Sequence, residues 1–351
     1  MQKTATSELR RVDLEQHIVK FQSGAETLTG ILVVRKGDAP DNLVVLLHGS
    51  EKRSALATNP MQYLLPSKGI AAFVFDKRGT GQSTGNYTHN FEILARDGVA
   101  ALTTARNALG GRNIAAGFLG GSQGAWVAPL AAARTPENAR PSFVIAAYGL
   151  AQGPLGEDRE EVFDDLRRHG FGDAATLAKA REITDATATV MRTNFADGFD
   201  RLNALKDKYG GQPWYSAVDG EFTGDFLWMP SWLLAVVGPI LEEGMIWDYD
   251  PLPIIESLPM PMLWVLAGKD TEAPSVTTFE ILRQLQKEKL PQLDIARFPE
   301  AEHGILRFRE KAGERILTGY EPGYFELLAN WIRTRELIAA PGVQTFRRTG
   351  G

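Results

Sequence analysis

The sequence lacks cysteine altogether, is poor in histidine and has no excess of positive charge. Without cysteine, the chain can form neither disulfides nor thiolate metal sites, and it cannot use a cysteine nucleophile. Its five histidines are scattered and no His-Glu-x-x-His motif occurs, so we expect no metal site. A formal net charge of −5 provides no basic surface, which argues against nucleic acid as a partner.

No phosphate-binding glycine motif is present either. The stretch 79–85 is rich in glycine, but the pattern G-x-x-x-x-G-K-[ST] does not occur. We therefore expect neither a nucleotide nor another cofactor.

Long hydrophobic runs are also missing. The most membrane-like stretch, Phe226–Leu241, is interrupted by Pro230, Gly238 and Pro239 and is too short to span a bilayer. We predict no membrane span and expect this stretch to be buried or to line a pocket. The first residues, Met1–Ser7, lack the apolar core of a signal peptide. The compartment stays open: cytoplasmic, or exported with the signal peptide absent from this chain.

The sequence does contain enough hydrophobic residues, 44% of 351, for a large core. From Leu14 to Lys36 it alternates as two antiparallel strands around a turn at 23–26. Continuous apolar runs separated by helix-length segments then follow. The runs are Leu43–Leu47, Ile70–Phe75, Ile114–Leu119, Ser142–Ala147, Met262–Leu266 and Leu293–Phe298. Strands that alternate with helices predict an α/β fold with a mostly parallel central sheet flanked by helices.

The alternation breaks between about residues 151 and 250. Charged, helix-favouring sequence leads there into an aromatic-rich segment, which predicts an inserted helical lid. Residues 1–150 and 251–340 would then form the two parts of the core. In the second part we expect helices at Ser275–Glu288 and Tyr324–Ile338, and residues 341–351 are expected to be a flexible tail.

A G-x-S-x-G pentapeptide, Gly120–Gly124, places Ser122 between an apolar run and a small-residue helical stretch. A nucleophile at the tip of a strand-to-helix turn has a strained backbone, and only glycine relieves the crowding beside it. Ser122 is therefore the candidate nucleophile. The alternative is that it only caps the helix.

A serine nucleophile needs a base, and the base needs an acid to orient it. Loops after the carboxyl ends of parallel strands form the site in open α/β sheets. His303 follows the last predicted core strand and is the candidate base, whereas His48, after the first, is taken as structural. Asp270, after the preceding strand, is the candidate acid. Its rivals by position in the sequence are Glu272, Glu300 and Glu302.

Acyl transfer also needs donors for the oxygen that becomes negative in the tetrahedral intermediate. The backbone N–H groups of Gln123, directly after the nucleophile, and of Ser50, in the loop after the first core strand, are the expected donors.

In the order of these motifs the chain resembles the α/β-hydrolases. The resemblance covers about Leu28 to Ile338 and includes 48–50, the loop 76–83 and the order Ser122, Asp270, His303. Residues 122–130 are similar to the S-Q-G-G-x-x-A-P sequences of bacterial esterases related to the prolyl-oligopeptidase and dienelactone-hydrolase branch. The resemblance implies an α/β-hydrolase fold, a nucleophile elbow and a structural role for 76–83.

Four residues are candidate contacts to substrate: Glu51, Trp126, Trp228 and Trp232. Glu51 departs from the H-G-S-G or H-G-G-G that many related enzymes have, and its carboxylate could repel an anionic substrate or bind a cationic one. The two other tryptophans belong to an aromatic-rich segment in the predicted lid, part of which would line an apolar cleft. The other part would form the core of the lid itself.

We therefore predict a serine hydrolase that cleaves a carboxylic ester through an acyl-enzyme, with a small apolar or aromatic ester as its substrate. A dry lid that admits another alcohol or amine would make it an acyltransferase. A peptidase or amidase, a lactonase and a thioesterase are alternatives on the same residues, because fold alone does not settle activity. A catalytically silent binding protein is a further alternative. The sequence does not indicate an oligomeric state.

Overall fold

A computed structural model of the chain describes residues 13–56, 59–112, 114–241 and 243–348. Met1–Ser7, on which the expectation about a signal peptide rests, lies outside the described residues.

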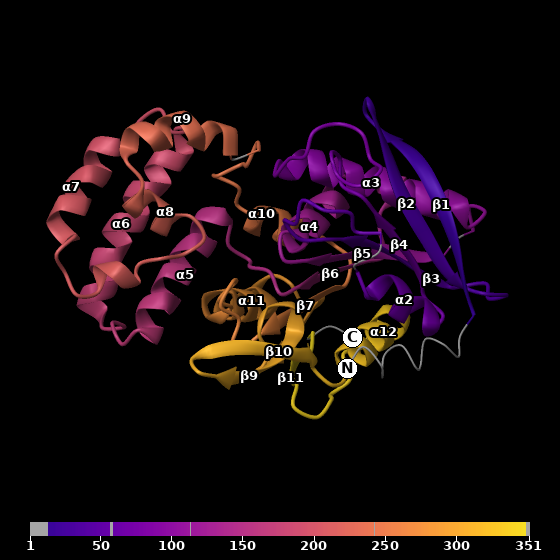
Figure 1. Ribbon diagram of the computed structural model, residues 1–351. Coiled ribbons are helices and arrows are strands. Elements are labelled where there is room, and N and C mark those ends of the chain that lie inside the picture. Colours follow the sequence, from indigo (N-terminus) through magenta and orange to yellow (C-terminus); the bar gives the residue numbers. More distant parts are fainter. Residues whose placement is uncertain (1–12, 57–58, 113, 242, 349–351) are drawn as a thin grey trace.

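The centre of the molecule is a mainly parallel sheet (Figure 1). Its strands in the described part of the chain are β1 (Leu14–Ser23), β2 (Glu26–Arg35), β3 (Asn42–Leu47), β4 (Ala71–Phe75), β5 (Ala115–Gly121), β6 (Phe143–Ala147), β7 (Met262–Ala267), β8 (Leu293–Phe298) and β11 (Gln344–Phe346). Their spatial order is β1-β2-β4-β3-β5-β6-β7-β8-β11. From β4 to β8 the neighbours are parallel, whereas β1, β2 and β11 join antiparallel. This is the predicted α/β-hydrolase arrangement of a mostly parallel sheet flanked by helices.

The strands of the sheet centre are apolar along their whole length because both faces are covered. In β3, Leu43, Val45 and Leu47 pack into one hydrophobic cluster, whereas Val44 and Leu46 pack into another on the opposite face. Side chains of a strand alternate between faces, so two buried faces require a continuous apolar run.

Helices cover the two faces of the sheet. The first cluster receives side chains from α3 (Phe91–Ala108), α4 (Gly124–Arg134), α10 (Leu252–Ser257) and α11 (Val276–Glu288). The second receives side chains from α2 (Met61–Ser67) and α12 (Tyr324–Thr334). Helix α12 ends four residues before the predicted Ile338.

Between β6 and β7 the chain forms a group of helices, which we call the helical insertion. Its α-helices are α5 (Pro154–Arg168), α6 (Ala174–Arg192), α7 (Phe199–Tyr209), α8 (Thr223–Trp228) and α9 (Ser231–Leu241). They lie together beside the sheet (Figure 1) and bury a third hydrophobic cluster of their own. Pro154 at the start of α5 and the side chain of Asp173, which caps α6, mark their first turns. The role of this insertion as a lid stays a prediction.

Two features of the second core segment differ from the sequence-based expectations. A hairpin of β9 (Leu306–Lys311) and β10 (Glu314–Tyr320) follows β8. The flexible tail expected at 341–351 is wrong for Gln344–Phe346, which form β11 on the edge of β8. The reason is packing: the ring of Phe346 lies 5.1 Å from that of Phe279, and Arg283 lies over it.

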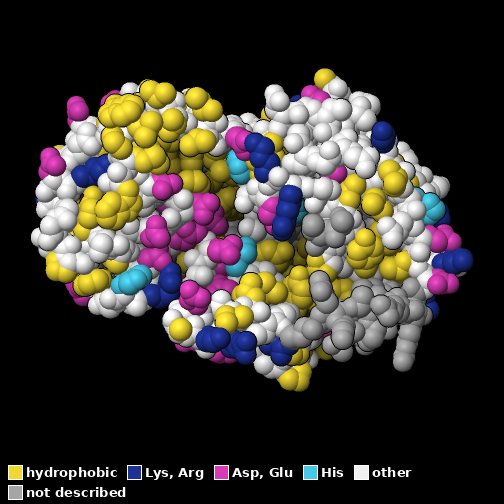
Figure 2. All heavy atoms as spheres, in the orientation of Figure 1, with side chains coloured by type: hydrophobic (Ala, Val, Ile, Leu, Met, Phe, Trp, Pro, Cys, Tyr) yellow, Lys and Arg dark blue, Asp and Glu magenta, His cyan; other side chains and the backbone are white. Residues whose placement is uncertain are grey.

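The apolar stretch 226–241 is only partly buried. Phe226 and Leu234 are buried, whereas Trp232, Val236 and Ile240 of α9 are exposed, and Figure 2 shows an apolar surface over this part of the helical insertion. The expectation that the stretch is buried or lines a pocket is therefore wrong for its outer face. No helix in the described ranges is both long and apolar enough to cross a membrane.

Candidate active site

Ser122 lies at the sharp turn between β5 and α4 and has a left-handed backbone conformation (φ 53°). Strand and helix approach so closely there that only glycine fits beside the serine. A Cβ atom on Gly120 would lie 1.8 Å from the carbonyl oxygen of Gly124, and one on Gly124 would lie 2.0 Å from that of Leu47. The glycines of the pentapeptide are thus required by steric contact, and they hold Ser122 at the tip of a strained turn.

His303 and Asp270 follow β8 and β7, two adjacent parallel strands. The Nδ1 atom of His303 lies 3.0 Å and 3.1 Å from the two carboxylate oxygens of Asp270. Asp270 is buried and also accepts hydrogen bonds from the backbone N–H groups of Ala273 (2.8 Å) and Glu272 (3.1 Å). These bonds fix the carboxylate against one edge of the imidazole.

The three rival carboxylates have other positions. Glu302 accepts hydrogen bonds from the backbone of Thr271 and His303 and pairs with an arginine, so it holds the loop. Glu300 is exposed and pairs with a lysine. Glu272 lies on the other edge of the imidazole, with its Oε2 3.6 Å from His303 Nε2.

The environment of His303 favours its protonated form. Burial lowers the pKa of His303, but the hydrogen bond and charge of Asp270, together with the charges of Glu272 and Glu157, outweigh burial and raise it to about 9.

The two predicted donor residues, Ser50 and Gln123, line one cavity together with Ser122. The loop that carries Ser50 passes close to the nucleophile. A Cβ atom added to Gly49, the residue before Ser50, would lie 3.2 Å from Ser122 Cβ. Among the hydrogen bonds between described residues, none uses the backbone N–H of Ser50 or of Gln123 as a donor. Both N–H groups are therefore free to bind a ligand.

A buried lysine connects these two donor residues. Lys77, two residues after β4, donates hydrogen bonds to the carbonyl oxygen of Gly49, the residue before Ser50, and to the Gln123 side chain (2.8 Å to Oε1). Burial lowers the pKa of Lys77 to about 7. On the other side, Gln123 Nε2 donates to Nδ1 of His89 (2.7 Å), a histidine whose pKa burial lowers to about 4. Sequence reasoning missed Lys77 and His89; the position of Lys77 after a core strand was the available signal.

The rest of the loop 76–83 has the structural contacts that the resemblance implies. Asp76 is buried and accepts hydrogen bonds from the backbone N–H groups of Ala55 (2.9 Å) and Gln82 (3.0 Å). Arg78 forms a buried ion pair with Asp97. These bonds tie the loop after β3 to the loop after β4.

Glu51 and His48 are paired with each other. Their Oε2 and Nδ1 atoms are 3.6 Å apart, and this contact, with a smaller contribution from Lys77, lowers the pKa of Glu51 to about 2. Glu51 lines a second cavity, of about 550 Å³, which also reaches Ser122 and His303.

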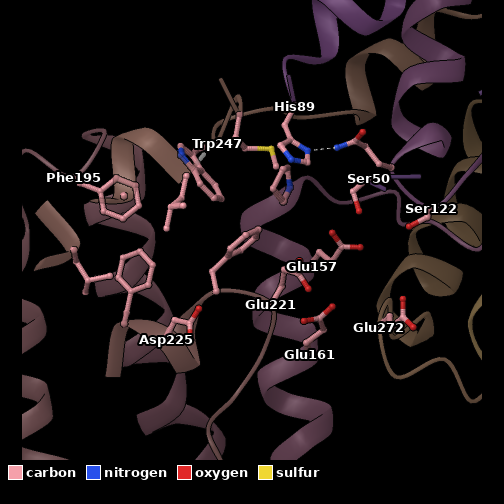
Figure 3. A pocket seen from close by; sticks show the side chains of 18 of the residues that line it. Ser50, His89, Ser122, Glu157, Glu161, Phe195, Glu221, Asp225, Trp247 and Glu272 are labelled. Carbon is pink, nitrogen blue, oxygen red and sulfur yellow. Dashed lines mark hydrogen bonds between the residues drawn. The ribbon is translucent and has the colours of Figure 1, made fainter. Parts of the chain in front are cut away.

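The first cavity, of about 480 Å³, lies between the core and the helical insertion. Figure 2 shows a hollow at this place with acidic side chains along it. Its apolar wall is formed by Phe195, Phe222, Phe226, Met229, Leu234, Val237, Leu241, Met245 and Trp247. Its carboxylates are Glu157, Glu161, Glu221, Asp225 and Glu272. In Figure 3, Glu157, Glu161 and Glu221 lie together, apart from Ser122 and Ser50.

The three predicted tryptophan contacts have different positions. Trp126 lines the first cavity, but its indole N–H is bound to the carbonyl oxygens of Leu150 (2.9 Å) and Gln152 (2.8 Å). Trp228 and Trp232 are 68% and 70% exposed and line neither cavity. The prediction that these two bind substrate is wrong, because they lie on the outer face of α8 and α9. The carboxylates of α5 were missed, since a charged helix is typical of a solvated surface.

No group of three or more His, Asp or Glu side chains in the described ranges has the geometry to hold a metal ion.

Comparisons with known proteins support the fold. Residues 38–155 match the model of the serine aminopeptidase S33 family, a match that includes Ser122 and ends before Asp270. The chain is similar to the esterase Pf2001 of Pyrococcus furiosus, with a TM-score of 0.52 and 16% identity over 86% of each chain. It is also similar to the acylaminoacyl peptidase of Pyrococcus horikoshii (TM-score 0.53, 13% identity), over 96% of this chain and 44% of that one.

No curated protein shows significant sequence similarity to the chain. Identities this low show the fold alone, and the family match adds the segment around the nucleophile. Sheet order, nucleophile turn and structural likeness together lead to one conclusion: the chain has an α/β-hydrolase fold, and its residues 38–155 are similar to the serine aminopeptidase S33 family.

Proposed function

We propose that the chain is a serine hydrolase that cleaves carboxylic esters through an acyl-enzyme, with Ser122 as nucleophile, His303 as base and Asp270 as the acid that orients it. One observation carries the proposal: Ser122, on a strained turn, shares its cavity with a histidine whose Nδ1 is bound by a buried carboxylate. An isolated helix cap would have no reason for either feature.

In the proposed reaction, the Ser122 hydroxyl attacks the ester carbonyl while His303 Nε2 takes its proton. The oxygen that becomes negative is bound by the free backbone N–H groups of Ser50 and Gln123. His303 then passes the proton to the leaving alcohol. In the second half, His303 activates a water molecule that attacks the acyl group, and Ser122 is released. Asp270 keeps the imidazole in the tautomer with the proton on Nδ1.

The helical insertion is proposed to act as a lid over this site. It supplies most of the apolar wall of the first cavity, from α8, α9, the segments beside them and Phe195, which follows α6. A lid that excludes water strengthens every electrostatic interaction at the reacting carbonyl.

Amide cleavage is the second candidate, because the matching family is described as serine aminopeptidases and the same groups can cleave an amide. Lactones and thioesters would use the same acyl chemistry.

The test combines p-nitrophenyl esters of increasing acyl length with a fluorophosphonate label. We expect ester turnover, with the label on Ser122, and loss of both in Ser122→Ala; the exposed Ser257→Ala is the matched control. Labelling without ester turnover would shift the assignment to an amide, lactone or thioester. Absence of labelling would overturn the serine hydrolase and leave a binding protein.

A further inference from the structure

Glu161 has an unusual position for a charged side chain. It lies on α5, lines the first cavity and is only 7% exposed. Nevertheless, its carboxylate has no hydrogen-bond or ion-pair partner among the residues that the structure describes. Its oxygens are not among the fully buried side-chain atoms that lack a partner, so the carboxylate is open to the cavity, where a ligand can bind it.

Neighbouring acidic residues of the same helix are used inside the protein. Asp158 accepts hydrogen bonds from the backbone N–H groups of Phe222 (2.8 Å) and Thr223 (2.9 Å). Glu160 accepts one from the hydroxyl group of Thr277 (2.9 Å). Glu161 therefore differs from them in facing the cavity rather than a protein donor.

Further carboxylates surround Glu161. Glu157 lies one helical turn before it, and Glu221 reaches the same region from the segment before α8 (Figure 3). Burial, followed by the charges of the neighbouring carboxylates, raises the pKa of Glu157 to about 8 and that of Glu161 to about 11. The charges on Glu161 come from Glu157, Glu221, Asp158 and Asp165. Like charges this close repel, so a bound cation would stabilise all of them.

Among the described lining residues, the one group whose environment favours a positive charge is His303, which is already bound to Asp270 and does not balance five carboxylates. Of its described lining residues, five are carboxylates and none is lysine or arginine. A metal ion fits poorly, since no set of three ligands with suitable geometry was found in the described part of the chain. The wall opposite is aromatic and aliphatic, with Phe222, Phe226 and Trp247 among its members. Aromatic faces attract organic cations, and apolar walls bind the hydrocarbon part that carries them.

We propose that the first cavity binds substrates in which a protonated amine is attached to an apolar body, with the ammonium group at Glu161, Glu157 and Glu221. This inference rests on the proposed serine hydrolase, and it names the substrate class: an ester whose acyl or alcohol part carries an ammonium group. It also modifies the expectation of a purely apolar or aromatic ester.

The test uses two probes of nearly equal shape, 2-phenylethylammonium and 2-phenylethanol, titrated into the full chain by isothermal calorimetry. We expect the Kd of the ammonium to be at least tenfold lower. Raised carboxyl pKa values predict in addition that ammonium binding releases protons, which makes the measured enthalpy depend on the buffer. Glu161→Gln should weaken ammonium binding at least fivefold and leave the alcohol unchanged.

Glu157→Gln is the second variant, because Glu157 is less buried than Glu161 and its replacement disturbs the fold less. Glu160→Gln, on the same helix but bound to Thr277, is the matched control and should change neither Kd. Equal binding of both probes, no binding of either, or binding of Ca²⁺ without the ammonium would each overturn the proposal.

Fluorophosphonate labelling of Ser122 in the same preparation separates the two claims. Labelling without ammonium preference leaves the hydrolase and rejects the cation site. Ammonium preference without labelling supports the cation site and rejects the hydrolase.

Discussion

At the scale of single residues, the imidazole of His303 is held between two carboxylates. Asp270 binds its Nδ1 edge, as the chain order of the motifs predicted, and Glu272 lies 3.6 Å from Nε2. The contact with Asp270 orients the imidazole as the proposed base. The charge of Glu272 stabilises the imidazolium form, which must lose its Nε2 proton before His303 can act as a base. The two contacts together set the pH range in which the proposed chemistry works.

The first prediction concerns pH. Only neutral His303 can accept a proton, so kcat/KM for an ester should rise as pH passes through the pKa of His303. Because that pKa is raised from 6.5 to about 9, the midpoint should lie on the alkaline side of 6.5. Glu272→Gln removes a negative charge that stabilises the imidazolium, so it should move the midpoint to lower pH. Glu280→Gln, an exposed change on α11, serves as control. A wild-type midpoint at or below pH 6.5 would contradict this prediction.

The second prediction concerns Lys77, a positioning residue that holds the loop of Ser50 and the side chain of Gln123. Lys77→Met keeps the volume but leaves the carbonyl oxygen of Gly49 and the Gln123 amide without their donor. We expect kcat to fall by about 10- to 100-fold, because the oxyanion donors lose their alignment, with little change in KM.

Lys20→Met, an exposed change on β1, is the control for Lys77→Met, and single-turnover ester kinetics give the readout. A rise in KM with kcat unchanged, or a fall in Tm with both kinetic constants unchanged, would show that Lys77 only supports the fold.

At the scale of elements, sequence patterns predicted best those strands that are buried on both faces of the sheet. The strands β3 to β8 are mostly apolar because helices cover both faces, so their runs were recognised within one or two residues. The hairpin β9–β10 was not recognised, since its strands carry charged, largely exposed side chains. Residues 344–346 were misassigned because three residues are too few for a periodic pattern.

Helix α9 shows a different limit of sequence reasoning. Its sequence is apolar almost all round, so composition did not reveal which face packs against the other helices of the insertion. Leu234 is buried, whereas Trp232 is exposed. For the opposite reason, the charged sequence of α5 did not reveal that one of its carboxylates, Glu161, is buried in the cavity.

The third prediction follows from these positions. Trp228→Ala and Trp232→Ala should leave kcat/KM for p-nitrophenyl esters within about twofold, because both side chains lie outside the cavities. Phe222→Ala, which removes part of the cavity wall, should lower kcat/KM for long acyl chains more than for acetate. Loss of activity in both tryptophan variants would restore their proposed role in substrate binding.

At the scale of the whole molecule, the parallel part of the sheet is flanked on both sides by antiparallel strands. One edge carries the hairpin β1–β2, and the other carries the short strand β11. Strand β11 is further held by Gln286, which donates to the Phe346 carbonyl oxygen (2.9 Å), and by Asp294, which accepts from the Arg348 backbone N–H (2.7 Å). An uncovered sheet edge would be a template for pairing with other chains.

The fourth prediction is that removal of residues 341–351 lowers Tm by roughly 2 to 5 °C and increases aggregation on heating. Phe346→Ala should cause part of this loss, since it removes the contacts with Phe279 and Arg283. Gln344→Ala changes an exposed side chain and is the control. Calorimetry and light scattering measure the two effects, and an unchanged Tm in the shortened chain would contradict the prediction.

The proposed nucleophile is reached from two cavities, one below the helical insertion and one beside Glu51. An ester bound across Ser122 would have its two halves in separate chambers. After the first bond breaks, the alcohol can depart through its own chamber while the acyl half stays where it is. In the proposed reaction the vacated chamber would admit water, so the shape of the site would set the order in which products leave.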